Sequence, residues 1–285
     1  MILLDYNQVM LAALFQSIGN HHNADINEDM IRHMFLNSLR ANRNKFAKNY
    51  GEIVICADGK SSWRKGEFPY YKANRKKTRD ESELDWGELY RIIALVREEL
   101  DEHFPYKVMH FDHLEADDII GAICEELGTE LNMGCEQILI LSADKDFVQL
   151  QKYANVSQYD PIQKKSIVHG DPSSYLFEHI LKGDSGDGIP NILSEDNCLV
   201  IGKRQKSMTS KKIAMFTNDF AAMEETEKHR FIRNQKLIDL SFIPDKYKKE
   251  VTDKYAEPKT LGRTKLFKYF VSRGLRNLVE DIGDF

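Results

Sequence analysis

Acidic side chains follow four short apolar runs, and this spacing is the strongest chemical signal in the chain. The runs cover residues 2–4, 53–57, 107–111 and 137–141, and a glycine-rich stretch at 183–188 adds two more acids. Taken in chain order, the candidate residues are Asp5, Asp58, Glu115, Asp117, Asp118, Asp144, Asp146, Asp184 and Asp187.

Such a group of acids implies bound cations if the fold brings its members together. Two like charges about 4 Å apart, at an effective dielectric constant near 20, repel by about 4 kcal/mol. The group must therefore hold protons or bind cations. A ligand set made of oxygen alone selects hard ions, Mg²⁺ or Mn²⁺. Two such ions, about 4 Å apart, activate water and stabilise the leaving oxygen of a phosphodiester.

Each acid also has an ordinary structural interpretation. A single aspartate after a strand, such as Asp5 or Asp58, often caps a helix or forms a turn. Acids in the first turn of a helix interact favourably with its dipole, which alone would explain Glu115 and Asp117. Asp144 and Asp146 lie two apart, so in an extended segment they point to the same side. Acids after all four runs, close to a basic segment, favour a functional interpretation.

The elements that must position these acids form an α/β pattern. Apolar runs alternate with helical stretches at about 26–48, 84–103 and 115–131, which predicts a mostly parallel sheet covered by helices. The continuous apolar character of the runs indicates strands buried on both faces. In an open parallel sheet the strand ends share one edge, where ligands bind. After Pro172 the chain is predicted to be helical, except for 183–188 and a loop at 190–206.

A basic segment at 59–79 interrupts this pattern. It carries eight Lys or Arg residues against one acid, Glu67, and it predicts an excursion from the core. Aromatic residues alternate with the basic ones (Trp63, Phe68, Tyr70 and Tyr71), which suits nucleic acid, because bases stack on rings and cations contact phosphates. A solvated surface run is the alternative. A second basic cluster comprises Lys203, Arg204, Lys206, Lys211 and Lys212.

Composition narrows the class further. The 285 residues are 42% hydrophobic and 30% charged, with a mean hydropathy of -0.49, as in a globular protein with an adequate core. No apolar run is long enough to cross a membrane and no leader precedes Asp5, which predicts a cytoplasmic protein. The four cysteines are scattered, which favours buried thiols over disulfides or a zinc site. The histidines, including the pair His21-His22, give no metal-binding pattern.

Four ordered motifs resemble the 5′ nuclease family. They are Tyr71-Lys-Ala-Asn-Arg75, Leu114-Glu-Ala-Asp-Asp-Ile-Ile-Gly121, Ser142-Ala-Asp-Lys-Asp-Phe-Val-Gln-Leu150 and Gly183-Asp-Ser-Gly-Asp-Gly-Ile-Pro190. The family includes flap endonucleases, the 5′-nuclease domain of DNA polymerase I and phage RNase H. The likeness is greatest to the RNase H branch of T-even bacteriophages, through Trp63-Arg-Lys, the tract 80–86 and Gly274-Leu-Arg-Asn-Leu. It is strong over residues 1–190 and weaker afterwards.

The resemblance implies a role for each matching residue. Asp5, Asp58, Glu115, Asp117, Asp118 and Asp144 would surround a first Mg²⁺, and Asp146, Asp184 and Asp187 a second, with Mn²⁺ as a substitute. Arg64 and Lys72 would engage the scissile phosphate at the base of a helical arch, with Tyr71 and Arg75 nearby. Lys203, Arg204, Lys211 and Lys212 would meet duplex phosphates. No covalent enzyme intermediate is implied.

The resemblance also predicts two regions. Residues 1–182 would form a PIN-like α/β nuclease core with a basic arch at about 59–90. Residues 183–285 would form a helical region with a helix–loop–helix element that binds duplex DNA. Three features depart from the family pattern: Asn191 to Gln205 lacks the usual glycines, Asp187-Gly188 replaces Asp-Asn, and only four residues precede Asp5, where some members carry a sliding-clamp tether.

The predicted function is that of a 5′-to-3′ exonuclease, flap endonuclease and RNase H. Its substrates would be DNA and RNA–DNA duplexes with a 5′ end, flap or fork, and its role the removal of RNA primers and adjacent DNA in lagging-strand synthesis. We expect a phage-encoded monomer, with a single-stranded-DNA-binding protein as a partner. The rival interpretations are a PIN-type ribonuclease, which would normally lack the arch and the second acidic loop, and a non-catalytic structure-specific DNA-binding protein, which would have lost metal ligands.

Overall fold

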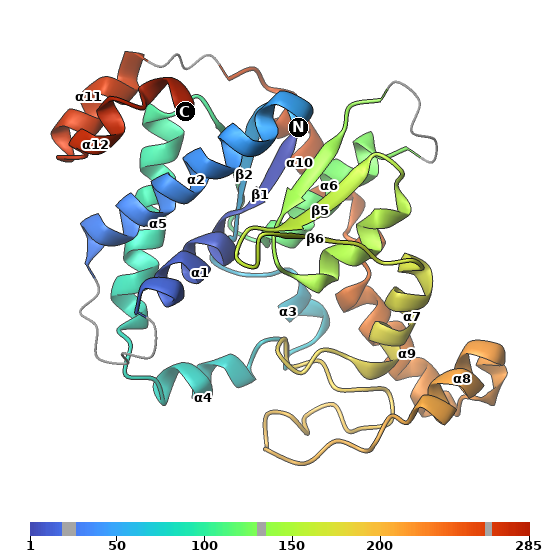
Figure 1. The fold of residues 1–285 in the computed structure, drawn as a ribbon. Coiled ribbons are helices and arrows are strands. Elements are labelled where there is room, and N and C mark those ends of the chain that lie inside the picture. Colours follow the sequence, from blue (N-terminus) through green and yellow to red (C-terminus); the bar gives the residue numbers. More distant parts are fainter. Residues whose placement is uncertain (19–26, 130–134, 260–263) are drawn as a thin grey trace.

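A six-stranded sheet with the order β3-β2-β1-β4-β5-β6 crosses the middle of the computed structural model (Figure 1). The structure describes residues 1–18, 27–129, 135–259 and 264–285, so the pair His21-His22 lies outside the described residues. The strands are β1 (Ile2–Asp5), β2 (Ile53–Ala57), β3 (Lys107–His110), β4 (Ile138–Leu141), β5 (Val156–Asp160) and β6 (Lys165–Ile167). Neighbouring strands are parallel except β5 and β6, which run antiparallel. The predicted mostly parallel sheet is confirmed.

The strand register brings the acids to one edge of the sheet. Leu4 of β1 lies beside Ile55 of β2 and Leu141 of β4, so these strands end level with one another. Strands β1, β2 and β4 are buried along their whole length, as their apolar sequences predict.

Helices cover both faces of the sheet (Figure 1). Alternate strand residues point to opposite faces. Accordingly, Ile2 and Leu4 pack with α1 (Tyr6–Ile18), α2 (Glu28–Tyr50) and α5 (Trp86–His103) in a first hydrophobic cluster. Leu3 packs with α6 (Ala116–Leu127) and α10 (Asp245–Ala256) in a second. The predicted helices coincide with α2, α5 and α6; residues 26 and 131, where two of them were expected to begin and end, lie outside the described residues.

Shorter elements surround the strand ends and complete the C-terminal half. The basic segment contains α3 (Arg64–Glu67) and α4 (Asn74–Asp80). The remaining helices are α7 (Pro172–Lys182), α8 (Ser210–Asn218), α9 (Glu225–Ile238), α11 (Thr264–Ser272) and α12 (Arg276–Val279), and the 3-10 helices are η1 (Lys145–Lys152), η2 (Phe220–Ala222), η3 (Leu240–Phe242) and η4 (Ile282–Asp284). Residues 191–209 contain turns but no helix or strand, which agrees with the loop predicted at 190–206. The helix–loop–helix element predicted within residues 183–285 stays a prediction.

Both predicted regions contribute to the same hydrophobic clusters. Leu266, Phe270 and Phe285 belong to the first cluster with β1, and Ile243 and Val251 belong to the second. The two predicted regions therefore do not have separate hydrophobic cores. Whether they act as distinct functional regions stays a prediction. Among the described residues, no helix is both long and apolar enough to cross a membrane.

Candidate metal centre

The acids that follow β1, β2, β4 and the loop after β3 meet at the edge of the sheet. Asp5 is buried and accepts a hydrogen bond from Ser142 Oγ (2.9 Å), and Asp58 accepts one from the Ala116 amide (2.8 Å). Burial, together with the charges of Asp58 and Asp144, raises the pKa of Asp5 to about 7. Burial and the charges of Asp144 and Asp5 raise the pKa of Asp117 well above its usual value. The repulsion expected from the sequence is therefore present in the fold.

Glu115 belongs to the same edge but has an opposite electrostatic environment. It caps the first turn of α6. Burial alone would raise its pKa, but the charges of Lys72 and Arg64 outweigh burial and lower the pKa to about 2. Tyr71 Oη also donates a hydrogen bond to Glu115 (2.7 Å). Glu115 is therefore ionised whether or not cations are bound.

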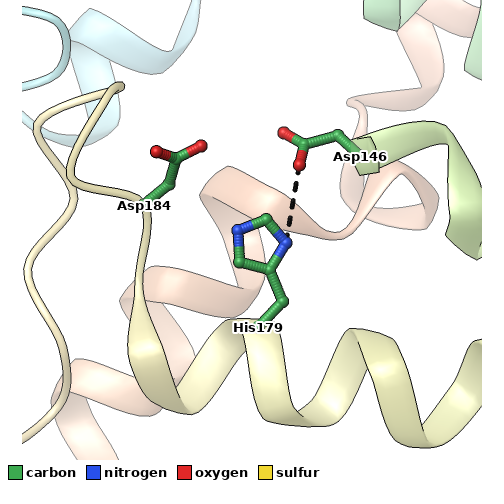
Figure 2. Close-up of side chains that lie close together, drawn as sticks. All are labelled: Asp146, His179 and Asp184. Atoms are coloured by element: carbon green, nitrogen blue, oxygen red, sulfur yellow. Dashed lines mark ion pairs between the residues drawn. The ribbon is translucent and has the colours of Figure 1, made fainter. Parts of the chain in front are cut away.

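A second group comprises Asp146, His179 and Asp184, which lie around one space (Figure 2). One ligand atom from each of the three lies within 4.8 Å of the others, and His179 Nδ1 is 3.5 Å from Asp146 Oδ1. Burial lowers the pKa of His179, which favours the neutral imidazole that binds metals. Burial and the charges of Asp144 and Asp184 raise the pKa of Asp146.

Two expectations from the sequence are corrected by this second group. The segment after Asp144 was expected to be extended, but it forms η1, and Asp146 in its first turn contacts His179 of α7. The histidines were expected to be uninformative, but His179 lies beside two of the predicted ligands, Asp146 and Asp184. The all-oxygen ligand set stays a prediction. The signal was available: His179 lies in the last turn of the predicted helix that leads into the loop of Asp184.

Asp187, the third predicted ligand of the second ion, contacts basic residues. It is paired with Arg75 and with Lys72 (3.5 Å), and it accepts a hydrogen bond from Tyr71 Oη (3.0 Å). The Lys72 amide donates to the Asp187 carbonyl (2.7 Å), and Lys72 adopts the left-handed conformation at φ 55°. The acidic loop is thus joined to the basic segment at this point.

Asp118 and Arg64 do not have the surroundings that the sequence predicted. Asp118 is fully buried: Oδ1 accepts from Trp63 Nε1 (3.1 Å) and pairs with Arg64 (2.8 Å), while Oδ2 accepts from the Glu115 amide (2.9 Å). Both oxygens are therefore engaged by the protein. Arg64 is 3% exposed: it donates through Nε to the Leu237 carbonyl (2.7 Å) and through Nη1 to Glu115 (3.3 Å), so its guanidinium group is buried behind the acidic edge. Its predicted contact with the scissile phosphate stays a prediction.

The aromatic and C-terminal basic residues also differ from one another in accessibility. Phe68 and Tyr71 are buried in a third hydrophobic cluster with α7 and α9, which rules out base stacking on these two rings as they stand. Lys203, Arg204, Lys211 and Lys212 are exposed, in the loop before α8 and in its first turn, and Lys203 pairs with Glu195 (2.8 Å). Their predicted contact with duplex phosphates stays a prediction.

The donor set fits divalent cations. Five carboxyl groups at the strand ends have raised pKa values, because they are buried and, for most of them, also because neighbouring acids repel their charge: Asp5, Asp58, Asp117, Asp144 and Asp146. Their charged forms are therefore unfavourable without counter-charge. Positive ions relieve this repulsion, and carboxylate oxygens are ligands of hard ions. The fold and this edge define a metal-dependent nuclease of the α/β class.

Sequence comparison identifies the family within that class. The chain belongs to the 5′-3′ exonuclease family: residues 1–175 match the model of its N-terminal resolvase-like domain. Residues 170–285 match the model of the C-terminal part of T4 RNase H. The chain is 35% identical to Ribonuclease H of Enterobacteria phage T4 over 296 residues, which cover 99% of this chain and 95% of the relative. The resemblance predicted from the four motifs is confirmed, and the protein is a nuclease.

Other relatives agree with this assignment. A 5′-3′ exonuclease of Buchnera aphidicola is 28% identical over 235 residues, covering 78% of this chain and 75% of the relative. The structure resembles T5 5′-exonuclease with bound divalent metal ions (zinc), with a TM-score of 0.61 at 16% identity over 89% of this chain and 98% of the other. It also resembles a bacteriophage T5 flap endonuclease in a complex with DNA and metal ions, with a TM-score of 0.60 at 15% identity over 90% and 99%. At these identities the two structures show the shared fold.

Proposed function

We propose that this protein is a structure-specific, Mg²⁺-dependent 5′ nuclease that removes RNA primers and adjacent DNA during lagging-strand replication. The observation that carries the proposal is the acidic strand edge joined to a basic segment through Lys72, whose ammonium group lies between Glu115 and Asp187. The names of the relatives, ribonuclease H, 5′-3′ exonuclease and flap endonuclease, support the same chemistry.

The carboxylates would hold two ions. Asp5, Asp58, Glu115, Asp117 and Asp144 would surround the first, and Asp146 and Asp184 would contribute to the second, with Asp187 beside it. When bound, the ions activate water and stabilise the charge that develops on the phosphodiester. Asp118 and Arg64 act as positioning residues, because together they fix the start of α6 and hence Glu115 and Asp117.

Lys72 and Arg75 would contact the phosphate backbone. Arg75 is exposed and Lys72 is partly exposed, and both are paired with Asp187 in the absence of substrate. A phosphate that reaches this edge competes with Asp187 for the two cations. Contacts of this kind position a strand without reading its bases, so RNA and DNA would both be accepted and substrate shape would decide.

We place this activity in the cytoplasm of a bacterial host, in a protein that acts as a monomer with a replisome single-stranded-DNA-binding protein as partner. The 35% identity to a phage ribonuclease H supports the proposal that this protein is encoded by a phage and acts in replication. Neither the partner nor the oligomeric state enters the chemistry of the site.

The test is cleavage of a 5′-flapped duplex and of an RNA-primed duplex, each labelled at one end and then at the other. The full chain, Asp144→Asn and a matched control, Asp112→Asn, are compared in Mg²⁺ and in EDTA. Asp112 is an exposed carboxylate that pairs with Lys60 (3.5 Å), so its loss removes the same charge outside the cluster. We expect short 5′ products from the wild type and from Asp112→Asn in Mg²⁺ only.

Other outcomes assign the protein differently. Binding without cleavage in Mg²⁺ or Mn²⁺ contradicts the proposal and indicates a structural DNA-binding protein. Cleavage confined to unstructured RNA indicates ribonuclease activity of the PIN type. Equal loss of activity in Asp144→Asn and Asp112→Asn contradicts the assignment of the edge as the reaction site.

A further inference from the structure

His179 is positioned by its helix to face the second acidic group. It lies in the last turn of α7, whose end is fixed by a hydrogen bond from the Gly183 amide to the His179 carbonyl (2.8 Å) and by the left-handed conformation of Gly183 (φ 65°). The ring of Tyr175, one turn earlier, contacts the imidazole edge to face, with centroids 6.0 Å apart. The side chain of His179 is 16% exposed. The imidazole is therefore held in place on a regular element.

The two acids that His179 faces come from independent segments. Asp146 lies in the first turn of η1, and Asp184 lies in the loop after α7 (Figure 2). Asp184 Oδ1 accepts hydrogen bonds from the amides of Gly186 (2.8 Å) and Asp187 (3.2 Å), which fixes the carboxyl group. Three donors from three elements thus converge on one space.

The spacing of the three donors suits one ion. Donors about 2.1 Å from a six-coordinate ion stand about 3.0 Å apart when adjacent and about 4.2 Å apart when opposite. The observed limit of 4.8 Å and the Nδ1–Oδ1 distance of 3.5 Å require only small movements to reach this range. Asp187 is not part of this group of three; in this structure it contacts Lys72, Arg75 and Tyr71.

We propose that His179 is a nitrogen ligand of the second metal position, with Asp146 and Asp184. The inference rests on the proposed two-ion function and names a donor that the all-oxygen set lacks. An imidazole ligand shifts the preference of a site towards Mn²⁺ and later first-row ions relative to Mg²⁺. The second position therefore retains Mn²⁺ against Mg²⁺ better than the first.

The test uses Mn²⁺ as a paramagnetic probe on the full chain. Bound Mn²⁺ ions are counted by electron paramagnetic resonance. The hyperfine coupling between Mn²⁺ and histidine nitrogen is measured by pulsed electron paramagnetic resonance, on protein with natural and with ¹⁵N-labelled histidine. His179→Gln is compared with His229→Gln, which alters an exposed histidine on α9. Thermal melting of each variant checks that it is folded.

In the wild type we expect two Mn²⁺ ions and a nitrogen coupling that changes with the label. In His179→Gln this coupling is lost, and the dissociation constant of the Mn²⁺ ion at the second position rises on the order of ten- to a hundredfold. In His229→Gln the nitrogen coupling and the dissociation constant stay as in the wild type. Two bound ions without nitrogen coupling in the wild type, or the same coupling in folded His179→Gln, would overturn the proposal.

Flap cleavage in Mg²⁺, measured on the same preparations, separates this inference from the function on which it rests. Cleavage without nitrogen coupling overturns the role of His179 and leaves the proposed function intact. Nitrogen coupling lost in His179→Gln, without any cleavage by the wild type, supports the ligand and overturns the nuclease assignment of this edge.

Discussion

Asp117 and Asp118 are neighbours at the start of α6, but their side chains lie in different surroundings and have different roles. Asp117 faces other acids, and burial with the charges of Asp144 and Asp5 raises its pKa. Asp118, one residue later, is enclosed by three donors from Trp63, Arg64 and the Glu115 amide. The helical turn separates the two side chains, so one can serve the metal edge while the other fixes the geometry of that edge.

Replacing these two residues should change stability in opposite directions. Asp118→Asn leaves the buried Arg64 without its full counter-charge, and we expect it to lower the free energy of unfolding by about 3 kcal/mol. Asp117→Asn removes repulsion, so the metal-free protein should become more stable while metal-dependent cleavage is lost. Urea unfolding in EDTA measures the first effect and flap cleavage the second. Stabilisation by both variants would show that Asp118 belongs to the repelling cluster.

Among the helices and strands, those that depend on local sequence could be predicted, whereas contacts between distant elements could not. The apolar runs give β1, β2 and β4, which are buried on both faces as their sequences predict. Strand β3, Lys107 to His110, forms as predicted, but only Met109 is fully buried, because this strand lies at the edge of the sheet. Strand β6, Lys165 to Ile167, has two exposed residues and no apolar run, and it exists through pairing with β5. The acids at the strand ends followed from the parallel topology. The contacts of His179, Asp187 and Arg64 did not, because they depend on how α7, the acidic loop and α9 pack together.

The junction between the acidic loop and the basic segment requires a glycine at position 188. Gly188 has φ 74°, and a Cβ there would lie 2.8 Å from the Tyr70 carbonyl and 3.2 Å from the Lys72 amide. Residues Asp187 and Lys72 meet at this junction, so its geometry bears on the site.

Gly188→Ala should therefore impair the site more than the replacement by alanine of another glycine that has a positive φ. Gly202→Ala is the matched control, because Gly202 has φ 71° and a Cβ added there would meet no atom within 4 Å. We expect a cost of about 1 kcal/mol for Gly202→Ala from the left-handed conformation alone. Gly188→Ala should cost more and reduce flap cleavage, as measured by melting and by initial rates. Equal effects of the two substitutions would mean that the close approach is relieved freely.

For the whole molecule, the metal edge reduces the stability of the metal-free protein. Carboxyl groups with raised pKa values surround the strand ends, while the hydrophobic clusters on both sheet faces draw residues from both ends of the chain. The shared core holds the acids together against their repulsion. Cation binding should therefore raise the free energy of unfolding, because the ions bind the folded site and not the unfolded chain.

Asp5 gives this balance a defined pH dependence. Its pKa is about 7 in the folded protein against 3.8 ordinarily, so the folded state keeps a proton that the unfolded chain releases. The stability from this proton is complete below about pH 4 and is lost as the pH rises through about 7, which amounts to about 4 kcal/mol for a shift of about three units. The lowered pKa values of His110 and His179 act in the opposite direction near pH 6, so the wild type must be compared with a variant that keeps both histidines.

That variant is Asp5→Asn, which retains a side chain able to contact Ser142. In EDTA, we expect the stability of the wild type to fall relative to Asp5→Asn between pH 5 and pH 8, because only the wild type develops the buried charge. In saturating Mg²⁺ at pH 8 the order should reverse, since the ionised Asp5 gains counter-charge that asparagine cannot use. Urea unfolding at each pH, with and without Mg²⁺, measures both differences. A difference that stays constant from pH 5 to pH 8 in EDTA would show that Asp5 ionises near its ordinary pKa and that the strand ends do not repel.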